Sequence, residues 1–326
     1  MNTREQSRWK RWGKGGAAVL AGALALGAGW QALASAHEAA QLERSGRMVE
    51  VGTHRMHLHC TGRGSPTVVL ESGATGGSSP WAWVQAELAQ QTRVCSYDRS
   101  GMQWSEASPL PRTAANVSAE LRTLLANAGE EGPFVLVGHS LGGIYARRFV
   151  ADHPEDVAGL VLLDSSHPDQ LDRLGDEARE LQSAFTSILQ ASPWLAHVGL
   201  MRATDLFAAQ AEGLPPAALA AAAHFVTQPG HLRTSAAELA HWDESMAQVR
   251  GAGPFGDLPL SVISAEKGDD AWLQLHREMA SLSSRAHYRV IPEADHLSVV
   301  MRKDHAAAVA AAIGELLAVV RNGGEA

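Results

Sequence analysis

The sequence predicts an α/β fold with a mostly parallel, eight-stranded sheet flanked by helices and a helical lid inserted after the sixth strand. Two observations lead to this expectation. From about Arg47 onward, short apolar stretches alternate with stretches of helical periodicity, a pattern typical of parallel strands covered by helices on both faces. Between Asp164 and Gly256 the strand pattern stops, and an Ala- and Leu-rich segment with helical spacing takes its place.

The expected elements follow the chain in order. Strands are expected at Met48–Val51, Arg55–Cys60, Thr67–Glu71, Arg93–Tyr97, Phe134–Val137, Gly159–Leu163, Leu260–Ser264 and His287–Ile291. Helices are expected at Trp81–Ala89, Ala114–Ala128, Ser140–Ala151, Trp272–Leu282 and His305–Val319. The chain therefore divides into a core in two parts (47–164 and 257–320), a helical cap or lid (165–256) and an N-terminal segment (1–36).

Composition and charge restrict the class of partner. The 326 residues are 45% hydrophobic and 19% charged, as in a folded globular domain, and their formal net charge is -8 at pH 7. Basic residues gather at the N-terminus, so the rest of the chain is clearly acidic; they are Arg4, Arg8, Lys10, Arg11 and Lys14. An acidic body without a basic patch argues against binding of nucleic acid.

The N-terminal segment has the features of a targeting sequence. Its basic arm precedes an apolar run from Gly15 to Ala36, and Ala34-Ser35-Ala36 has the small-x-small form of a signal-peptidase site. The run is roughly 20 residues long, which is also enough to span a bilayer. We expect either a signal peptide cleaved near Ala36 or a membrane anchor at residues 15–36. Either way the body is exported, periplasmic or extracellular, and touches the membrane only through this segment if it is retained.

A single serine stands between glycines where the strand ending at Val137 is followed by a helix. Gly138-His139-Ser140-Leu141-Gly142 has the form G-x-S-x-G in a strand–turn–helix context, in which glycines permit a sharp reversal and the serine hydroxyl stands clear of the sheet. The backbone N–H of Leu141 and the positive end of the helix face the same space, where they can stabilise an oxyanion. The motif predicts Ser140 as a nucleophile.

A serine nucleophile needs a base that removes its proton. Among the 15 histidines, His296 stands out because it lies C-terminal to Ser140, after the last expected strand and the loop Pro292–Asp295. We expect His296 to be this base.

Several stretches carry a family resemblance in the right order and spacing: HLHCTGRGSPTVVLESG, TRVCSYDRSG, GPFVLVGHSLGG, HPEDVAGLVLLDSSHPDQ and EADH. The chain resembles the α/β-hydrolase superfamily from about Arg47 to its end, and more narrowly an N-terminally anchored bacterial group of serine hydrolases. The resemblance implies an α/β-hydrolase fold and a Ser-His-acid triad under a helical lid.

The acid of the triad has more than one candidate. Most of the superfamily takes it from the end of the strand that is here Leu260–Ser264, where Asp269 and Asp270 follow and Glu266 is a third choice. The narrower group usually has no acid there and keeps the aspartate of VLLDSSH, which is Asp164. Both strand ends face the same edge of the sheet, so either can reach the imidazole. We prefer Asp164.

The resemblance also implies a second oxyanion donor in the loop after the Thr67–Glu71 strand. The matching position is Ala74, whose backbone N–H would act together with that of Leu141. Two positions depart from the pattern. Ser72-Gly73 stands where the superfamily often has His-Gly, and Gln103 stands where the family has glycine, in a loop that usually shapes the pocket wall.

The function that these residues imply is hydrolysis of a carboxylic ester in a small molecule, through an acyl-enzyme and without a metal or organic cofactor. The apolar composition of 165–256 favours a hydrophobic substrate group. The same triad would also serve amide or C–C bond hydrolysis or acyl transfer, and a non-catalytic ligand-binding relative is a further alternative. Epoxide hydrolases and haloalkane dehalogenases use aspartate where Ser140 stands.

The chain has two cysteines, Cys60 and Cys95, too few for a disulfide scaffold or a cysteine-rich metal cluster. In this fold the second and fourth strands, which carry them, are neighbours. They are either bridged, as export to an oxidising compartment favours, or two separate buried thiols.

Overall fold

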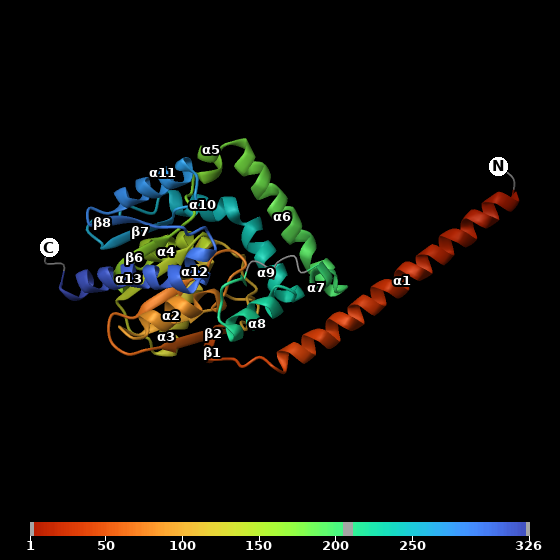
Figure 1. The fold of residues 1–326 in the computed structure, drawn as a ribbon, viewed down its shortest axis with the longest axis horizontal. Coiled ribbons are helices and arrows are strands. Elements are labelled where there is room, and N and C mark those ends of the chain that lie inside the picture. The colour runs from red at the N-terminus through yellow and green to blue at the C-terminus, as the bar shows by residue number, and fades with distance from the viewer. Residues whose placement is uncertain (1–2, 205–210, 324–326) are drawn as a thin grey trace.

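A computed structural model describes residues 3–204 and 211–323, and these contain an eight-stranded sheet in the order β1-β2-β4-β3-β5-β6-β7-β8 (Figure 1). Its strands are β1 (Arg47–Val51), β2 (His54–Thr61), β3 (Val68–Glu71), β4 (Val94–Tyr97), β5 (Phe134–His139), β6 (Val157–Leu163), β7 (Leu260–Ala265) and β8 (Ala286–Ile291). β2 pairs antiparallel with β1 and β4, and all other neighbours are parallel. The predicted fold is confirmed, and each strand lies within about two residues of its expected bounds.

The core helices pack on this sheet, and a second group of helices follows β6. The core helices are α2 (Ala82–Leu88), α3 (Ala114–Ala128), α4 (Leu141–Asp152), α11 (Asp270–Met279), α12 (Ser298–Met301) and α13 (Lys303–Arg321). The later group is α5 (Gln170–Leu174), α6 (Asp176–His197), α7 (Leu200–Thr204), α8 (Pro216–Phe225), α9 (Pro229–Ala240) and α10 (Trp242–Arg250). Short 3₁₀ turns occupy Ser79–Trp81, Pro154–Asp156 and Ala280–Leu282. The helix expected from Trp81 thus splits into a 3₁₀ turn, which Pro80 starts, and α2.

The central strands are apolar on both faces because both faces are covered. Val135 and Val137 of β5 pack in one hydrophobic cluster with α2 and α13, whereas Phe134 and Leu136 pack in another with α3 and α4. Successive strand residues point to opposite faces, so a continuous apolar run is required here. This explains why the uninterrupted run before Gly138 predicts a buried strand.

The helices of residues 165–256 form the cap. Apolar residues of α6, α9 and α10 form a third cluster with Leu141, Ile144 and Tyr145 of α4. Because α4 begins directly after β5, this packing holds the cap above the carboxyl ends of the central parallel strands, where sites form in open α/β sheets.

The N-terminal helix α1 (Thr3–Ala39) leaves the body of the molecule, as Figure 1 shows. Its segment Gly16–Ala39 has a mean hydropathy of 1.6, is only 6% buried, and is long and apolar enough to cross a membrane. The apolar N-terminal segment expected from the sequence is therefore a helix.

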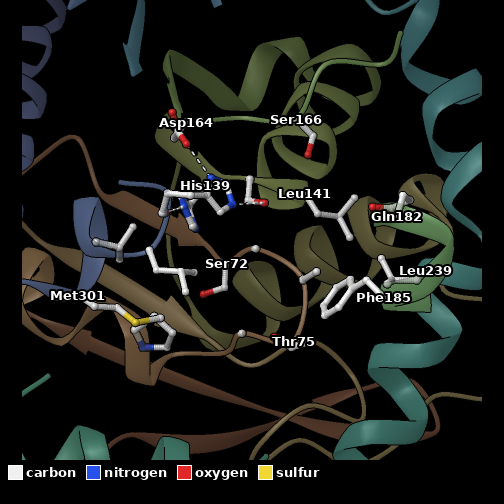
Figure 2. Close-up of a pocket in the computed structure, with 18 of the residues that line it drawn as sticks. Ser72, Thr75, His139, Leu141, Asp164, Ser166, Gln182, Phe185, Leu239 and Met301 are labelled. Carbon is white, nitrogen blue, oxygen red and sulfur yellow. Dashed lines mark hydrogen bonds and ion pairs between the residues drawn. The ribbon is translucent and has the colours of Figure 1, made fainter. Parts of the chain in front are cut away.

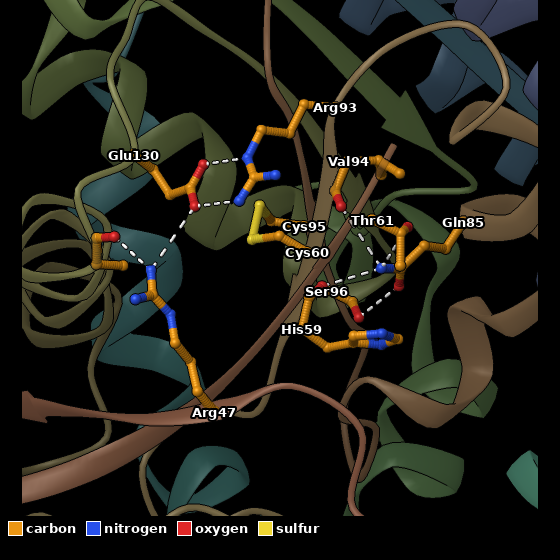
Figure 3. The surroundings of a disulfide bond; sticks show 11 residues. Arg47, His59, Cys60, Thr61, Gln85, Arg93, Val94, Cys95, Ser96 and Glu130 are labelled. Carbon is orange, nitrogen blue, oxygen red and sulfur yellow. Dashed lines mark hydrogen bonds and ion pairs between the residues drawn. A yellow bond between two sulfur atoms is a disulfide. The ribbon is translucent and has the colours of Figure 1, made fainter. Parts of the chain in front are cut away.

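Cys60 and Cys95 form a disulfide between β2 and β4 (Figure 3). The antiparallel register sets Cys60 directly opposite Cys95, so the two side chains meet without any shift of the strands. Beside the bridge, Arg93 makes a bidentate ion pair with Glu130, with its Nε 2.6 Å from the carboxylate. Of the two alternatives for the cysteines, the structure has the bridged one.

Candidate active site

Ser140 occupies the turn between β5 and α4. Its backbone has φ 54° and ψ −126°, in a region that a side chain other than glycine's rarely adopts and that costs on the order of 1–3 kcal/mol. The turn is held by neighbours: the N–H of Ser140 donates to the carbonyl of Leu163 at 3.2 Å, and its own carbonyl accepts from Ser166. A Cβ on Gly142 would lie 2.4 Å from the carbonyl oxygen of Glu71, so glycine is required there.

A chain of hydrogen bonds links Asp164, His296 and Ser140. The Nε2 of His296 lies 3.0 Å from Ser140 Oγ, and its Nδ1 lies 2.6 Å from Asp164 Oδ2. The other carboxylate oxygen of Asp164 accepts from the backbone N–H of Ala265 and from the indole of Trp272. Figure 2 shows Asp164 on one side of the pocket, with its carboxylate bonded to an imidazole.

Burial alone would raise the pKa of Asp164, but the hydrogen bond and charge of His296 lower it to about 2. The carboxylate is therefore ionised at any pH near neutrality. It can hold the imidazole in one tautomer and stabilise the imidazolium that forms when Ser140 loses its proton.

The other acid candidates have different partners. Asp269 caps α11, where its carboxylate accepts from the N–H of Trp272 at 2.7 Å, and Asp270 is exposed in the first turn of that helix. Glu266 accepts from the N–H of Glu293 at 2.8 Å. The structure thus brings together Ser140, His296 and Asp164, and leaves these three acids on the rim of the same sheet edge.

Two backbone N–H groups lie next to the serine without an acceptor. Leu141 is the first residue of α4, whose N–H has no partner within the helix, and Ala74 lies in the loop after β3. Among the described residues, no carbonyl or side chain accepts from either group. The loop is pressed against Ser140, since a Cβ on Gly73 would lie 2.9 Å from Ser140 Cβ.

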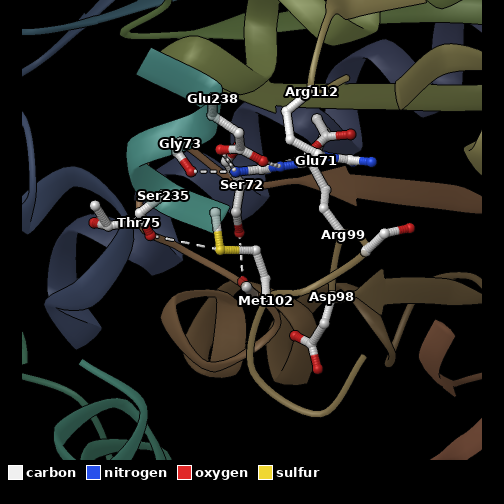
Figure 4. Close-up of polar contacts among 12 residues, drawn as sticks. Glu71, Ser72, Gly73, Thr75, Asp98, Arg99, Met102, Arg112, Ser235 and Glu238 are labelled. Atoms are coloured by element: carbon white, nitrogen blue, oxygen red, sulfur yellow. Dashed lines mark hydrogen bonds and ion pairs between the residues drawn. The ribbon is translucent and has the colours of Figure 1, made fainter. Parts of the chain in front are cut away.

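The sequence did not identify Arg99, which binds the loop after β3 that contains Ala74 (Figure 4). Arg99 is 1% exposed and donates to the carbonyls of Ser72 at 2.6 Å and Gly73 at 2.9 Å. It also makes ion pairs with Glu71 and, through two bonds, with Glu238 of α9. Burial would lower the pKa of Arg99, but these two carboxylates raise it well above its ordinary value, so it stays charged.

This contact fixes the direction of the Ala74 N–H. The carbonyl of Gly73 and the N–H of Ala74 belong to one trans peptide group, in which they point in opposite directions. Because Arg99 binds the carbonyl on one side, the N–H is directed to the other side. Glu238 belongs to the cap, so Arg99 links the cap to the candidate oxyanion loop.

His139, the variable residue of the motif, supports His296. Its Nε2 lies 2.8 Å from the backbone carbonyl of His296, and the two rings lie 4.8 Å apart at their centroids. Burial, followed by the charge of His296, lowers the pKa of His139 to about 3. The ring is therefore neutral at physiological pH, when its Nε2–H can donate to that carbonyl.

A cavity of about 700 Å³ lies above Ser140, between core and cap. Its cap wall is mainly apolar, and Phe185 and Leu239 project into it (Figure 2). Gln103 also lines the cavity and has a positive φ of 39°, which glycine would adopt without strain, and this explains why the family has glycine there. Its backbone N–H donates to His231 of α9, so this departure ties the pocket wall to the cap.

Curated relatives match parts of this chain. The chain is 30% identical over 237 residues to "Probable transporter efuK" of Hormonema carpetanum, covering 68% of the chain and 31% of the relative. It is 38% identical over 102 residues to "Putative carbamate hydrolase RutD" of Klebsiella pneumoniae, covering 31% of the chain and 38% of the relative. The chain thus spans about a third of the length of these curated relatives.

Solved structures share the fold at low identity. The epoxide hydrolase CorEH superposes with a TM-score of 0.68 at 18% identity, covering 84% of this chain and 99% of that one. A thermophilic esterase from Thermogutta terrifontis superposes with a TM-score of 0.65 at 21% identity, covering 85% and 99%. A family model described as the alpha/beta hydrolase family matches residues 68–312, which include strands β3 to β8 and the cap. The chain belongs to the alpha/beta hydrolase family.

Proposed function

We propose that this protein hydrolyses a carboxylic ester through an acyl-enzyme formed on Ser140, with His296 as general base and acid and Asp164 as the residue that orients and stabilises the imidazole. The observation that carries the proposal is the unbroken chain of hydrogen bonds from the buried Asp164 through His296 to Ser140 Oγ. The strained turn supports it, because strain of this kind is retained where a side chain must be presented.

The steps follow from the positions of the groups. His296 Nε2 takes the proton of Ser140 as Oγ attacks the ester carbonyl, and the N–H groups of Ala74 and Leu141 bind the resulting oxyanion. The intermediate collapses as His296 gives the proton to the leaving alcohol. Water, deprotonated by His296, then attacks the acyl group, and a second collapse returns the proton to Ser140 and releases the acid.

A serine at position 140 favours some of the reactions that this fold supports over others. A hydroxyl forms an acyl-enzyme with esters, amides and carbamates, whereas the epoxide hydrolases and dehalogenases of the superfamily use aspartate at this position. Of these reactions, ester cleavage needs the least activation of the leaving group. Amide, carbamate or C–C bond hydrolysis and acyl transfer on the same triad are the alternatives that kinetics must separate.

The apolar cap wall predicts a hydrophobic acyl or alcohol group. With p-nitrophenyl esters of increasing acyl length, kcat/KM of the full chain in detergent micelles should rise by up to about fourfold per methylene, the value of about 0.8 kcal/mol per buried CH₂, until the cavity is filled. Parallel p-nitroanilides should turn over far more slowly. A maximum at acetyl esters would contradict a hydrophobic site.

We also propose export, with the body periplasmic or extracellular and α1 as its membrane segment. The apolar helix behind a basic arm supports this orientation, and the Cys60–Cys95 bridge is of the kind that persists in oxidising compartments. These features also fit the N-terminally anchored bacterial serine hydrolases that the sequence resembles.

Arg99 should act as a positioning residue for the oxyanion. Arg99→Lys keeps the charge but not the fork that binds the Ser72 and Gly73 carbonyls, so we expect kcat to fall on the order of 100-fold with KM little changed, as when one oxyanion donor is lost. A trifluoromethyl ketone inhibitor, whose adduct carries the oxyanion, should lose affinity to a similar extent. Glu238→Gln should show a smaller effect of the same kind.

The matched control is Arg93→Lys, which breaks a similar bidentate pair with Glu130 beside the disulfide. It should leave kcat unchanged. If Arg99→Lys and Arg93→Lys lost thermal stability alike and neither changed kcat, Arg99 would have a structural role only.

A further inference from the structure

The C-terminal part of α1 is attached to the cap by polar contacts. Gln31, which is only 5% exposed, donates to the carbonyl of Thr227 at 2.9 Å and accepts from Arg202 at 3.1 Å. Glu38 makes an ion pair with Arg202, and its carboxylate lies 2.9 Å from Nδ1 of His224. These partners come from α7 and α8 and from the turn that follows α8, so α1 and the cap are joined at several points.

The backbones also meet closely. A Cβ on Gly27 would lie 2.2 Å from the carbonyl oxygen of Val198, and one on Gly199 would lie 2.9 Å from the ring of Trp30. The turn between α6 and α7 therefore packs directly against α1. N-terminal to this contact, residues 16–26 of α1 are exposed.

The length of this exposed stretch of α1 determines how close the cap lies to the membrane. At about 1.5 Å per residue, residues 16–26 extend roughly 16 Å, whereas the hydrocarbon core of a bilayer is roughly 30 Å thick. The basic arm ending at Lys14 must remain on the other side. A membrane around α1 therefore reaches the α1–cap contact.

The cap carries apolar side chains at that point. Trp194 lies one helical turn before Val198 and is 76% exposed, and Leu200 at the start of α7 is 44% exposed. On α1, Trp30 and Leu33 are also exposed beside the contact. Exposed apolar side chains that gather around one contact indicate an interaction surface, and tryptophan prefers the boundary between lipid and water.

We propose that α1 is retained as an anchor and that the α6–α7 corner of the cap, with Trp194 and Leu200, rests in the interface of a phospholipid bilayer. The continuity of this corner with a membrane-length helix identifies lipid as the occupant. Cleavage after Ala36 would remove Gln31 from the contact and leave Arg202 with fewer partners. On the proposed function, the cap would then lie next to esters dissolved in the membrane.

The test measures depth and does not depend on activity. Full-length Trp194→Cys and Leu200→Cys variants, labelled with an environment-sensitive NBD probe, are reconstituted in phosphatidylcholine–phosphatidylglycerol vesicles with and without spin-labelled lipids. The native cysteines are bridged and do not react. Both probes should emit at shorter wavelength and be quenched by lipids labelled near the headgroup. Ala318→Cys, at an exposed position of α13, is the control; α13 and α7 lie on opposite sides of the body (Figure 1).

A second variant tests the attachment itself. In the Trp194→Cys background, Glu38→Ala together with Gln31→Ala should return the probe to the emission of the Ala318→Cys control, with the protein still membrane-bound. Water-like emission without quenching at both cap positions would overturn the docking. An intact mass lacking residues 1–36 in membrane preparations would overturn retention of α1. Either result would leave the proposed ester hydrolysis untouched.

Discussion

Ser140→Ala is expected to abolish ester hydrolysis, and His296→Ala to lower kcat on the order of a thousandfold or more. Alanine lacks the attacking oxygen, and without the imidazole at 3.0 Å no hydrogen-bond partner among the described residues can take the proton of Ser140 Oγ. Both side chains border the cavity, and alanine tolerates the positive φ at position 140 no worse than serine does, so the fold should survive. Steady-state kinetics and thermal unfolding of each variant measure the two effects separately.

Matched controls come from exposed residues of the same types. Ser187→Ala on α6 and His287→Ala on β8 should keep the wild-type kcat. Near wild-type turnover in Ser140→Ala or His296→Ala would refute the mechanism, whereas loss of activity in all four variants would indicate an unspecific effect on folding.

Asp164→Asn is expected to reduce kcat by on the order of 10⁴-fold, while Asp269→Asn and Asp270→Asn stay close to wild type. Asparagine preserves the shape of Asp164 but can neither stabilise the imidazolium nor keep the productive tautomer. At position 269 asparagine is still a good helix cap, so little stability should be lost. A collapse of kcat in Asp269→Asn or Asp270→Asn with an active Asp164→Asn would transfer the acid's role to the strand end after β7.

The pH dependence gives the same assignment a second check. With the pKa of Asp164 lowered to about 2, its carboxylate stays ionised across the working range, so titration of Asp164 should contribute nothing to the pH dependence of kcat/KM measured there. A lowered pKa also means that ionised Asp164 stabilises the fold at any pH above the pKa of this group in the unfolded chain, which is about 4. This contribution is lost as the pH falls toward 2.

The sequence predicts those features that depend on local pattern. Strands appear at their expected places because apolar runs such as Phe134–Val137 must be buried on both faces, and Ser140 is marked by the glycines that its turn requires. The sequence left the identity of the triad acid undecided because β6 and β7 end at the same sheet edge. Only the three-dimensional arrangement shows Ala265 and His296 bonded to Asp164.

Long-range polar contacts have no local signal. Arg99 and Glu238 are 139 positions apart, and no periodicity connects a loop arginine with a glutamate on a cap helix. No local pattern predicts the contact of His139 with His296 either, since the two residues are 157 positions apart. Gln31 is instructive in another way: in the sequence it interrupts an apolar run, whereas in the structure it is a buried contact with the cap.

The most direct measurement of the central claim is covalent labelling with a fluorophosphonate, which reacts with an activated serine to give a stable phosphonyl ester. The full-length protein is labelled, its intact mass is determined, and the modified residue is located by peptide mapping. We expect one adduct per chain, on Ser140, with loss of esterase activity in proportion and no adduct in Ser140→Ala. A protein that hydrolyses esters yet carries no adduct, or carries it on another residue, would contradict Ser140 as the nucleophile.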